Sequence, residues 1–156
     1  MKKSVSTEPK VSVIVPVYNQ ERFIGRCLRS LLHQTVSQHT YEIIVVNDGS
    51  TDKTNYALEL FCDPDDFVVK VVTNEAKIGL PASLNRGIKA ARAPNIVRVD
   101  SDDFVNTNFI NFLCFYLENN INADAVACDY LLLSDAEDVL EQCDCLEKPI
   151  ACGIMF

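Results

Sequence analysis

Four consecutive residues near the middle of the chain are the strongest candidates for chemistry: Asp100, Ser101, Asp102 and Asp103. They follow an apolar run at 96–99, so they stand where a strand would end. Two carboxylates separated by one residue can coordinate a hard divalent cation such as Mn²⁺ or Mg²⁺ together with phosphate oxygens. The alternative is a solvated acidic turn that caps the next helix, because aspartate is common in turns. The polar clusters that follow two other apolar runs favour the metal site.

Those two clusters contain residues suited to binding a nucleoside. Asp48 follows the run at 42–47 and could accept a hydrogen bond from a ring N–H of a base such as uracil. Tyr18 follows the run at 11–16 and could stack on that base. Taken singly, a turn aspartate and a strand-edge aromatic explain them equally well. Taken with residues 100–103, they predict one site for base, ribose and diphosphate.

The usual phosphate-binding loops are absent from the sequence. The five glycines, at 25, 49, 79, 87 and 153, fit neither the dinucleotide motif G-x-G-x-x-G nor a P-loop. The net charge of −8 offers no positive surface for a phosphate backbone, so a nucleic acid is not expected as a partner. A nucleotide would need a cation between its phosphates and this acidic chain.

The elements that must position these residues alternate between strand and helix. Apolar runs predict strands at 11–16, 42–47, 68–73, 96–99 and 125–132. Apolar residues at helical spacing predict helices at 21–34, 81–91 and 108–117, and Ser50 or Thr51 is a plausible N-cap for another that ends near Phe61. This alternation predicts an α/β fold with a mainly parallel sheet, whose ligands bind at the carboxyl ends of the strands.

The length of 156 residues suits one domain of ordinary size. We expect an N-terminal extension at 1–10, a nucleotide-binding α/β domain at 11–133, and an acidic loop with the start of an acceptor-side region at 134–156. We expect no signal peptide, because the first ten residues contain no apolar stretch; no apolar run has membrane-spanning length, and the seven cysteines make an odd count. These features predict reduced thiols and a cytoplasmic protein, either free in the cytoplasm or at the inner face of the membrane.

Four stretches of the chain carry a resemblance to a known family: VSVIVPVYNQERFIGRCLRSLLHQT, EIIVVNDGSTDKT, NEAKIGLPASLNRGIKAA and VRVDSDD. In this order they resemble the nucleotide-binding half of the inverting family 2 glycosyltransferases, from residue 11 to about residue 105. The resemblance implies the Rossmann-like GT-A fold, a mainly parallel sheet flanked by helices. It also implies metal-dependent transfer of a sugar, with inversion, as in polysaccharide biosynthesis. The donor would be a nucleotide diphosphate sugar, UDP- or dTDP-linked, and the acceptor a hydroxyl of a carbohydrate or glycolipid.

The resemblance also implies roles for individual residues. It assigns to the nucleotide-sugar site Pro16, Val17, Tyr18, Glu21, Asp48, Lys77, Gly79, Leu80, Asn85, Asp100 and Ser101. It assigns Asp102 and Asp100 to the metal, which would be Mn²⁺ or Mg²⁺. Many family members have an arginine where this chain has Leu84, so charge compensation near the phosphates would rest on the metal, Arg86 or Lys77.

The family's general base is an Asp or Glu well beyond the D-x-D motif, in the acceptor-binding half. This chain ends on an apolar run, 150–156, that reads as the beginning of a strand. We therefore expect a sequence truncated at its C-terminus, with the base beyond Phe156. Apolar surface exposed by such a truncation would favour self-association.

Two other functions fit some of the same residues. The chain could bind a nucleotide and a metal without catalysing a reaction. It could also be a phosphohydrolase of the haloacid dehalogenase type, but there the first aspartate follows the first strand, whereas Asp100 follows the fourth predicted strand. Cys143, Cys145 and Cys152 supply three sulfurs where structural zinc uses four ligands, so we do not expect a zinc site.

Overall fold

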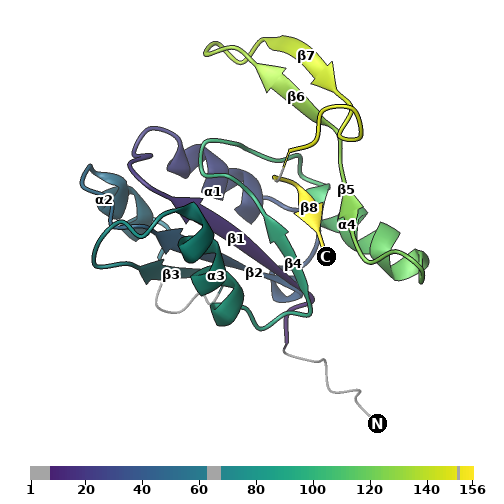
Figure 1. Cartoon of the computed structure of the whole chain (residues 1–156), viewed down its shortest axis with the longest axis horizontal. Helices are drawn as coiled ribbons and strands as arrows, with labels where there is room; N and C mark the ends of the chain where they lie inside the picture. The colour runs from purple at the N-terminus through teal and green to yellow at the C-terminus, as the bar shows by residue number, and fades with distance from the viewer. Residues whose placement is uncertain (1–7, 63–67, 151) are drawn as a thin grey trace.

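The centre of the molecule is a six-stranded sheet with strand order β3-β2-β1-β4-β8-β5. This computed structural model describes residues 8–62, 68–150 and 152–156 (Figure 1). The strands of the sheet are β1 (Val11–Val17), β2 (Tyr41–Asn47), β3 (Val69–Thr73), β4 (Asn95–Arg98), β5 (Val126–Ala127) and β8 (Ile154–Met155).

The first four strands are parallel, and the sheet becomes antiparallel at one side. β1 pairs in parallel with both β2 and β4, and β2 pairs in parallel with β3. β8 pairs antiparallel with β4 and β5. The predicted α/β fold is confirmed, and the carboxyl ends of β1, β2, β3 and β4 lie along one edge of the sheet.

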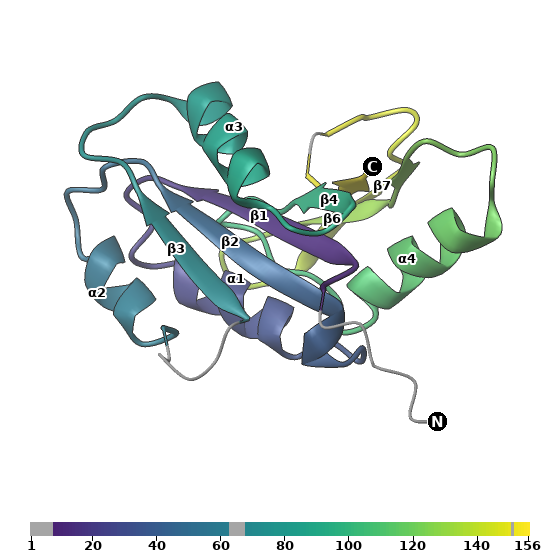
Figure 2. The same cartoon turned by 90° about the horizontal axis from the view of Figure 1, so that it is seen from below.

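Helices cover both faces of the sheet (Figure 2). α1 (Ile24–Leu32), α2 (Thr54–Glu59) and α4 (Phe109–Asn119) contribute to the core on one face, and a short 3₁₀ helix η1 (Gln38–Thr40) precedes β2. α3 (Leu80–Ala90) covers the other face. The result is a three-layer α/β arrangement.

β1 and β2 are buried on both faces, which explains their continuous apolar sequences. Alternate residues point to opposite sides: Val13 and Val15 join the core under α1, while Ile14 joins the core under α3. Gly87 of α3 is what allows that helix to lie so close. A Cβ at position 87 would come within 2.5 Å of Ile14 Cγ2, so any side chain would push α3 away from β1.

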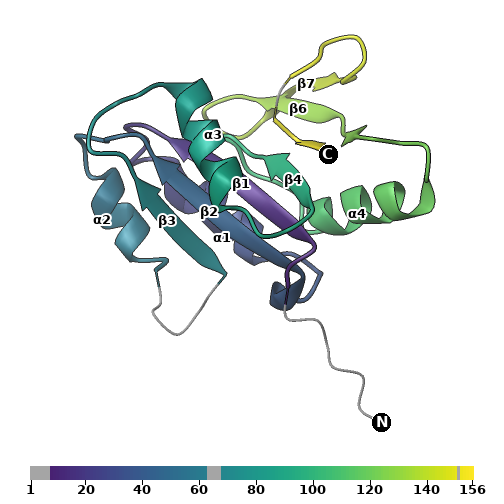
Figure 3. The ribbon, with the colours of Figure 1, turned by 60° about the horizontal axis from the view of Figure 1, so that its bottom comes forward.

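A separate β-hairpin projects beyond the main sheet (Figures 1 and 3). It consists of β6 (Tyr130–Leu133) and β7 (Val139–Cys143), paired antiparallel. The prediction of one strand at 125–132 was wrong, because the chain leaves the main sheet at Cys128 and Asp129. Asp129 Oδ1 accepts a hydrogen bond from the N–H of Cys145 at 3.0 Å, and the Cys128 thiol lies 3.7 Å from the carbonyl of Gly153. These contacts hold the two chain segments that connect the hairpin to the sheet.

Other differences from the predicted elements are local. Ser50 and Thr51 do not cap α2, which begins at Thr54 with no side-chain cap. Instead Ser50 Oγ accepts the N–H of Asn19 at 3.0 Å, and Asn19 Oδ1 accepts the N–H of Thr51 at 2.8 Å. Those hydroxyl and amide groups therefore join the loops after β1 and β2 and do not cap the start of α2. The acidic segment after residue 134, predicted as a loop, contains β7, whereas β8 lies within the run 150–156 that was predicted to begin a strand. Within the described ranges, no helix has the length and apolar character needed to cross a membrane.

Candidate functional site

A pocket of about 220 Å³ lies at the carboxyl ends of β1 and β2, beside the start of α3. It is lined by Pro16, Val17, Tyr18, Asp48, Lys77, Leu80 and Ser83. Six of these seven residues were assigned to a nucleotide-sugar site from the sequence, and the structure brings them together. Ser83 was not among them.

Asp48 is the charged residue most firmly fixed in this pocket. Its side chain is buried, and its Oδ1 accepts hydrogen bonds from Asn74 Nδ2 at 2.7 Å and from the N–H of Ile78 at 2.8 Å. Its Oδ2 accepts the N–H of Gly79 at 2.8 Å. One carboxylate at the end of β2 therefore organises the whole loop between β3 and α3.

Burial by itself would raise the pKa of Asp48. Hydrogen bonds from Ile78, Asn74, Gly79 and Ser83 more than offset this effect and hold the pKa below its usual value. The carboxylate is consequently ionised and remains an acceptor over the whole physiological pH range.

Asn74 and Gly49 complete this arrangement, and neither was proposed from the sequence. Asn74 is buried, donates to Ser83 Oγ at 3.1 Å as well as to Asp48, and accepts a hydrogen bond from Arg86. Gly49 has φ +70°, and a Cβ there would lie 2.7 Å from the main chain of Ala76, so the loops after β2 and β3 touch at that point. Asn74 could have been identified from the sequence, because it directly follows a predicted strand, as Asp48 does.

Lys77 and Tyr18 form one wall of the pocket. Lys77 Nζ lies 3.8 Å from the centre of the Tyr18 ring, which is cation–π distance. The ammonium group therefore covers one face of that ring. A base can stack on this face only if Lys77 moves aside.

Five of the predicted nucleotide-sugar residues lie outside the pocket lining: Glu21, Gly79 and Asn85, and also Asp100 and the buried Ser101, which follow β4. Glu21 is exposed, and its Oε2 accepts the N–H of Lys53 at 2.7 Å, so it joins the loops after β1 and β2. Asn85 is exposed on α3. The main-chain N–H of Gly79 donates the hydrogen bond to Asp48 that is described above.

The acidic cluster follows β4 along the same edge of the sheet. Asp100 forms a bidentate ion pair with Arg98: Nε is 2.6 Å from Oδ1 and Nη2 is 2.9 Å from Oδ2. Both oxygens of Asp100 are thus engaged by one guanidinium, and each retains a second acceptor position. The sequence analysis did not single out Arg98, although its place two residues before Asp100 on a strand puts both side chains on the same side.

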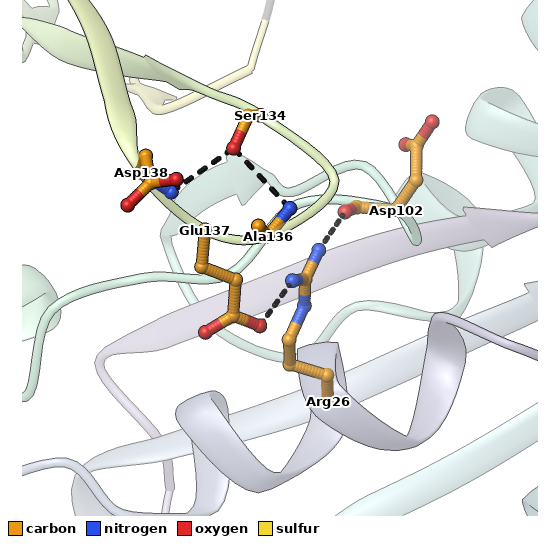
Figure 4. Close-up of polar contacts among 6 residues, drawn as sticks. All are labelled: Arg26, Asp102, Ser134, Ala136, Glu137 and Asp138. Carbon is orange, nitrogen blue, oxygen red and sulfur yellow. Dashed lines mark hydrogen bonds and ion pairs between the residues drawn. The ribbon is translucent and has the colours of Figure 1, made fainter.

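Asp102 and Asp103 stand in different surroundings. The main-chain carbonyl of Asp102 accepts a hydrogen bond from Arg26 Nη2 at 3.1 Å, while its exposed carboxylate points away from that guanidinium (Figure 4). Asp103 lies beside Cys152, and the ligand atoms of Asp100, Asp103 and Cys152 lie within 4.8 Å of one another. Asp102, which was assigned to the metal together with Asp100, is not in that group, and neither are Cys143 and Cys145.

The pKa of Asp103 is raised, first by burial and then by the neighbouring charges of Asp102 and Asp100; a hydrogen bond with the Cys152 side chain and the charge of Arg26 oppose the shift. The part of this shift that comes from Asp102 and Asp100 reflects the concentration of negative charge in the cluster. Several carboxylate oxygens with excess negative charge are a donor set that fits a hard divalent cation. The residues present therefore suit Mn²⁺ or Mg²⁺.

Comparison with known proteins places the pocket and the acidic cluster inside one family region. Residues 12–131 match the family model described as glycosyl transferase family 2. The uncharacterized glycosyltransferase EpsJ of Bacillus subtilis is 42% identical over 122 residues, which are 78% of this chain and 34% of that protein. The chain thus spans about a third of the length of this curated relative.

Solved structures agree with this assignment. The TarS 1–349 structure of S. aureus in complex with UDP-GlcNAc superposes with a TM-score of 0.72 at 29% identity, covering 85% of this chain and 37% of that one. The mannosyltransferase PcManGT of Pyrobaculum calidifontis, in complex with GDP-Man and Mn²⁺, superposes with a TM-score of 0.71 at 26% identity. That match covers 79% of this chain and 36% of the mannosyltransferase.

Proposed function

This chain belongs to glycosyl transferase family 2, and on that premise we propose that it binds a nucleoside diphosphate sugar together with a divalent cation. One observation carries the proposal: the Asp48 pocket and the acidic cluster after β4 lie along the same edge of one parallel sheet. A nucleotide needs two different environments, an enclosed one for the base and a charged one for the phosphates. This edge offers both.

The base would bind in the pocket of Asp48. Uracil and thymine present a ring N3–H, which an ionised carboxylate accepts, whereas cytosine presents an acceptor at the same position. A carboxylate has about four acceptor positions, and the hydroxyl of Ser83 can rotate to another partner. Asp48 can therefore take a hydrogen bond from a base without releasing the main-chain N–H groups of Ile78 and Gly79.

The phosphates would be neutralised by groups at both ends of the site. Lys77 can swing from the Tyr18 ring toward a diphosphate, which would also expose the ring for stacking. Asp102, with Asp100 or Asp103 beside it, would hold Mn²⁺ or Mg²⁺. The bound cation would stabilise negative charge on the departing diphosphate. Leu84, which stands where many relatives have arginine, packs against the core under α3 and takes no part.

We propose that the complete activity is transfer of the sugar to an acceptor hydroxyl with inversion. This requires a base that deprotonates the acceptor. The curated relatives extend well beyond the matched region, and we place the base in the part of the protein equivalent to their unmatched length. The identity of the sugar and of the acceptor would be set by the same part.

Calorimetric titration tests the donor site directly. UDP, dTDP, GDP and CDP are each titrated into the protein with and without Mn²⁺, and uridine serves as a ligand that lacks phosphates. We expect UDP and dTDP to bind more tightly than CDP, and Mn²⁺ to strengthen the binding of the diphosphates but not of uridine. Equal affinity for UDP and CDP would refute the role of Asp48, and the absence of any nucleotide binding would refute the proposed function.

A further inference from the structure

The β6–β7 hairpin has no part in the donor site described so far, yet its turn reaches the acidic cluster. Glu137, in the turn at 134–138, pairs with Arg26 of α1: Arg26 Nη1 donates to Glu137 Oε1 at 2.8 Å. Among the residues that the structure describes, no other hydrogen bond or ion pair joins this turn to the rest of the chain. The hairpin turn is therefore held by a single arginine.

The turn is built so that Glu137 points at that arginine. Ser134 accepts the N–H of Glu137 through its carbonyl at 2.9 Å, and its Oγ accepts the N–H groups of Ala136 at 3.2 Å and Asp138 at 3.1 Å (Figure 4). Glu137 itself has φ +66°, an uncommon conformation for a residue other than glycine. Ser134 thus holds the main chain of the turn from which the Glu137 side chain projects.

Arg26 is fixed from the other side by the body of the protein. Its guanidinium lies 4.5 Å from the centre of the Phe104 ring and 5.9 Å from that of Phe23. Its second amino group, Nη2, donates to the main-chain carbonyl of Asp102 at 3.1 Å. One guanidinium therefore connects α1, the D-x-D loop and the hairpin turn (Figure 4).

We propose that Arg26 is a positioning residue for the cation site, and that Glu137 couples the hairpin to that site through the same guanidinium. This inference rests on the proposed function. Holding the carbonyl of Asp102 fixes the main chain from which the Asp102 carboxylate projects. Residues that orient metal ligands in this way typically change metal affinity by about 10- to 100-fold when they are removed. Displacement of the hairpin would therefore change the position of Arg26, and through it the main chain of Asp102 in the donor site.

The exposure of the ion pair argues against a purely structural role. The side chains of Arg26 and Glu137 are 34% and 58% exposed, and ion pairs at such sites contribute little to folding stability. A contact that is weak and reversible suits a coupling between the hairpin and a binding site. It also means that variants at these positions should fold.

The test compares Arg26→Met, Arg26→Lys and Glu137→Gln with two matched controls. Arg29→Met removes an arginine one turn further along α1, and Asp138→Asn removes a charge from the same turn without touching Arg26. We expect Arg26→Met to weaken Mn²⁺-dependent UDP binding by about 10- to 100-fold, with uridine affinity unchanged. Arg26→Lys should recover part of the loss, Glu137→Gln should lose a few-fold, and both controls should match the wild type.

Hydrogen exchange of the hairpin amides supplies a readout that does not depend on ligand binding. Exchange across 134–143 should be faster in Arg26→Met and Glu137→Gln than in the wild type and in Asp138→Asn. Unchanged exchange in both variants, or UDP binding in Arg26→Met equal to that of the wild type, would overturn the inference. Equal loss of uridine and UDP binding would do so as well, because it would show general disruption of the fold. If wild-type protein binds no nucleotide, the proposed function fails, while the exchange data still decide whether Arg26 holds the hairpin.

Discussion

Asp48 and the acids after β4 lie along one edge of the same sheet, but the protein balances their charges to different degrees. Asp48 is buried and accepts hydrogen bonds from two main-chain N–H groups and one amide. In the second region, Asp100 is paired with Arg98, while Asp102 and Asp103 are exposed and the pKa of Asp103 is raised. In the first region, the folded protein itself supplies the hydrogen bonds that stabilise the Asp48 carboxylate. The second retains negative charge that a cation can balance. We therefore expect binding of the phosphates to depend on the metal and binding of the base to be independent of it.

The largest effect expected from this contrast is at Asp102. Asp102→Ala should weaken binding of UDP in the presence of Mn²⁺ by about 100-fold or more, because cation coordination to phosphates is worth several kcal/mol. Uridine binding should not change. Calorimetry of UDP and uridine with and without Mn²⁺ measures both quantities. Asp124→Ala, an equal loss of charge at an exposed residue outside the site, is the control; a variant at position 102 with wild-type affinity and metal response would show that the cluster is only a turn.

Asp48→Asn should act on stability as well as on base preference. The amide NH₂ of asparagine would face one of the N–H groups of Ile78 or Gly79, leaving a buried donor without an acceptor. Such a loss costs about 1–3 kcal/mol of unfolding free energy, which urea denaturation can measure. The preference for UDP over CDP should also decrease, because an amide can present either a donor or an acceptor. A variant as stable as the wild type would contradict the hydrogen-bonding scheme.

The same carboxylate predicts how stability changes with pH. The pKa of Asp48 is lower in the folded state than in the unfolded chain, so its contribution is complete above the unfolded-state pKa. That contribution is lost as the pH falls through the folded-state pKa. Urea midpoints of wild type and Asp48→Asn should therefore converge in acid and diverge toward neutral pH. Parallel curves over this range would mean that Asp48 titrates alike in both states.

Arg98→Met should have the smallest effect, and it sharpens the contrast at the second region. The arginine side chain lines an apolar pocket with Ile96 and Ile154, so methionine can replace its packing. Asp100 would lose its partner, and the added negative charge should weaken UDP binding without metal by about 3- to 10-fold. The gain in affinity on adding Mn²⁺ should increase correspondingly. If the gain is unchanged, Arg98 does not set the charge of the cation site.

The residues of the two regions could be predicted from the sequence only in part. The strands with apolar runs, and the pocket residues Tyr18 and Asp48, were identified because periodicity and strand-end position are local signals. Pro16, Val17 and Lys77 were assigned only through the resemblance to the family. Asn74, Ser83 and Arg98 were missed because each matters only through a partner that folding brings close. Asp48 and Asn74, for example, are 26 positions apart yet share a hydrogen bond of 2.7 Å.

The hairpin shows a second limit. Residues 125–132 read as one strand because their side chains favour extended structure, but β5 and β6 belong to different sheets. Strand propensity describes a residue's preference and not its partner. The sequence analysis did not single out Arg26, since nothing in its sequence neighbourhood indicates a contact with Glu137, 111 positions away.

The division of the chain at Cys128 and Asp129 has a consequence for how such a protein can diversify. The hairpin begins and ends at a joint where Asp129 meets Cys145 and Cys128 meets Gly153. Residues can be inserted or deleted beyond that joint without shifting the register of β5 against β8, since the two sheets share no strand. Lineages of this chain could thus vary the length and composition of the hairpin outside the turn that contacts Arg26, while the sheet that carries Asp48 and Asp102 is inherited intact.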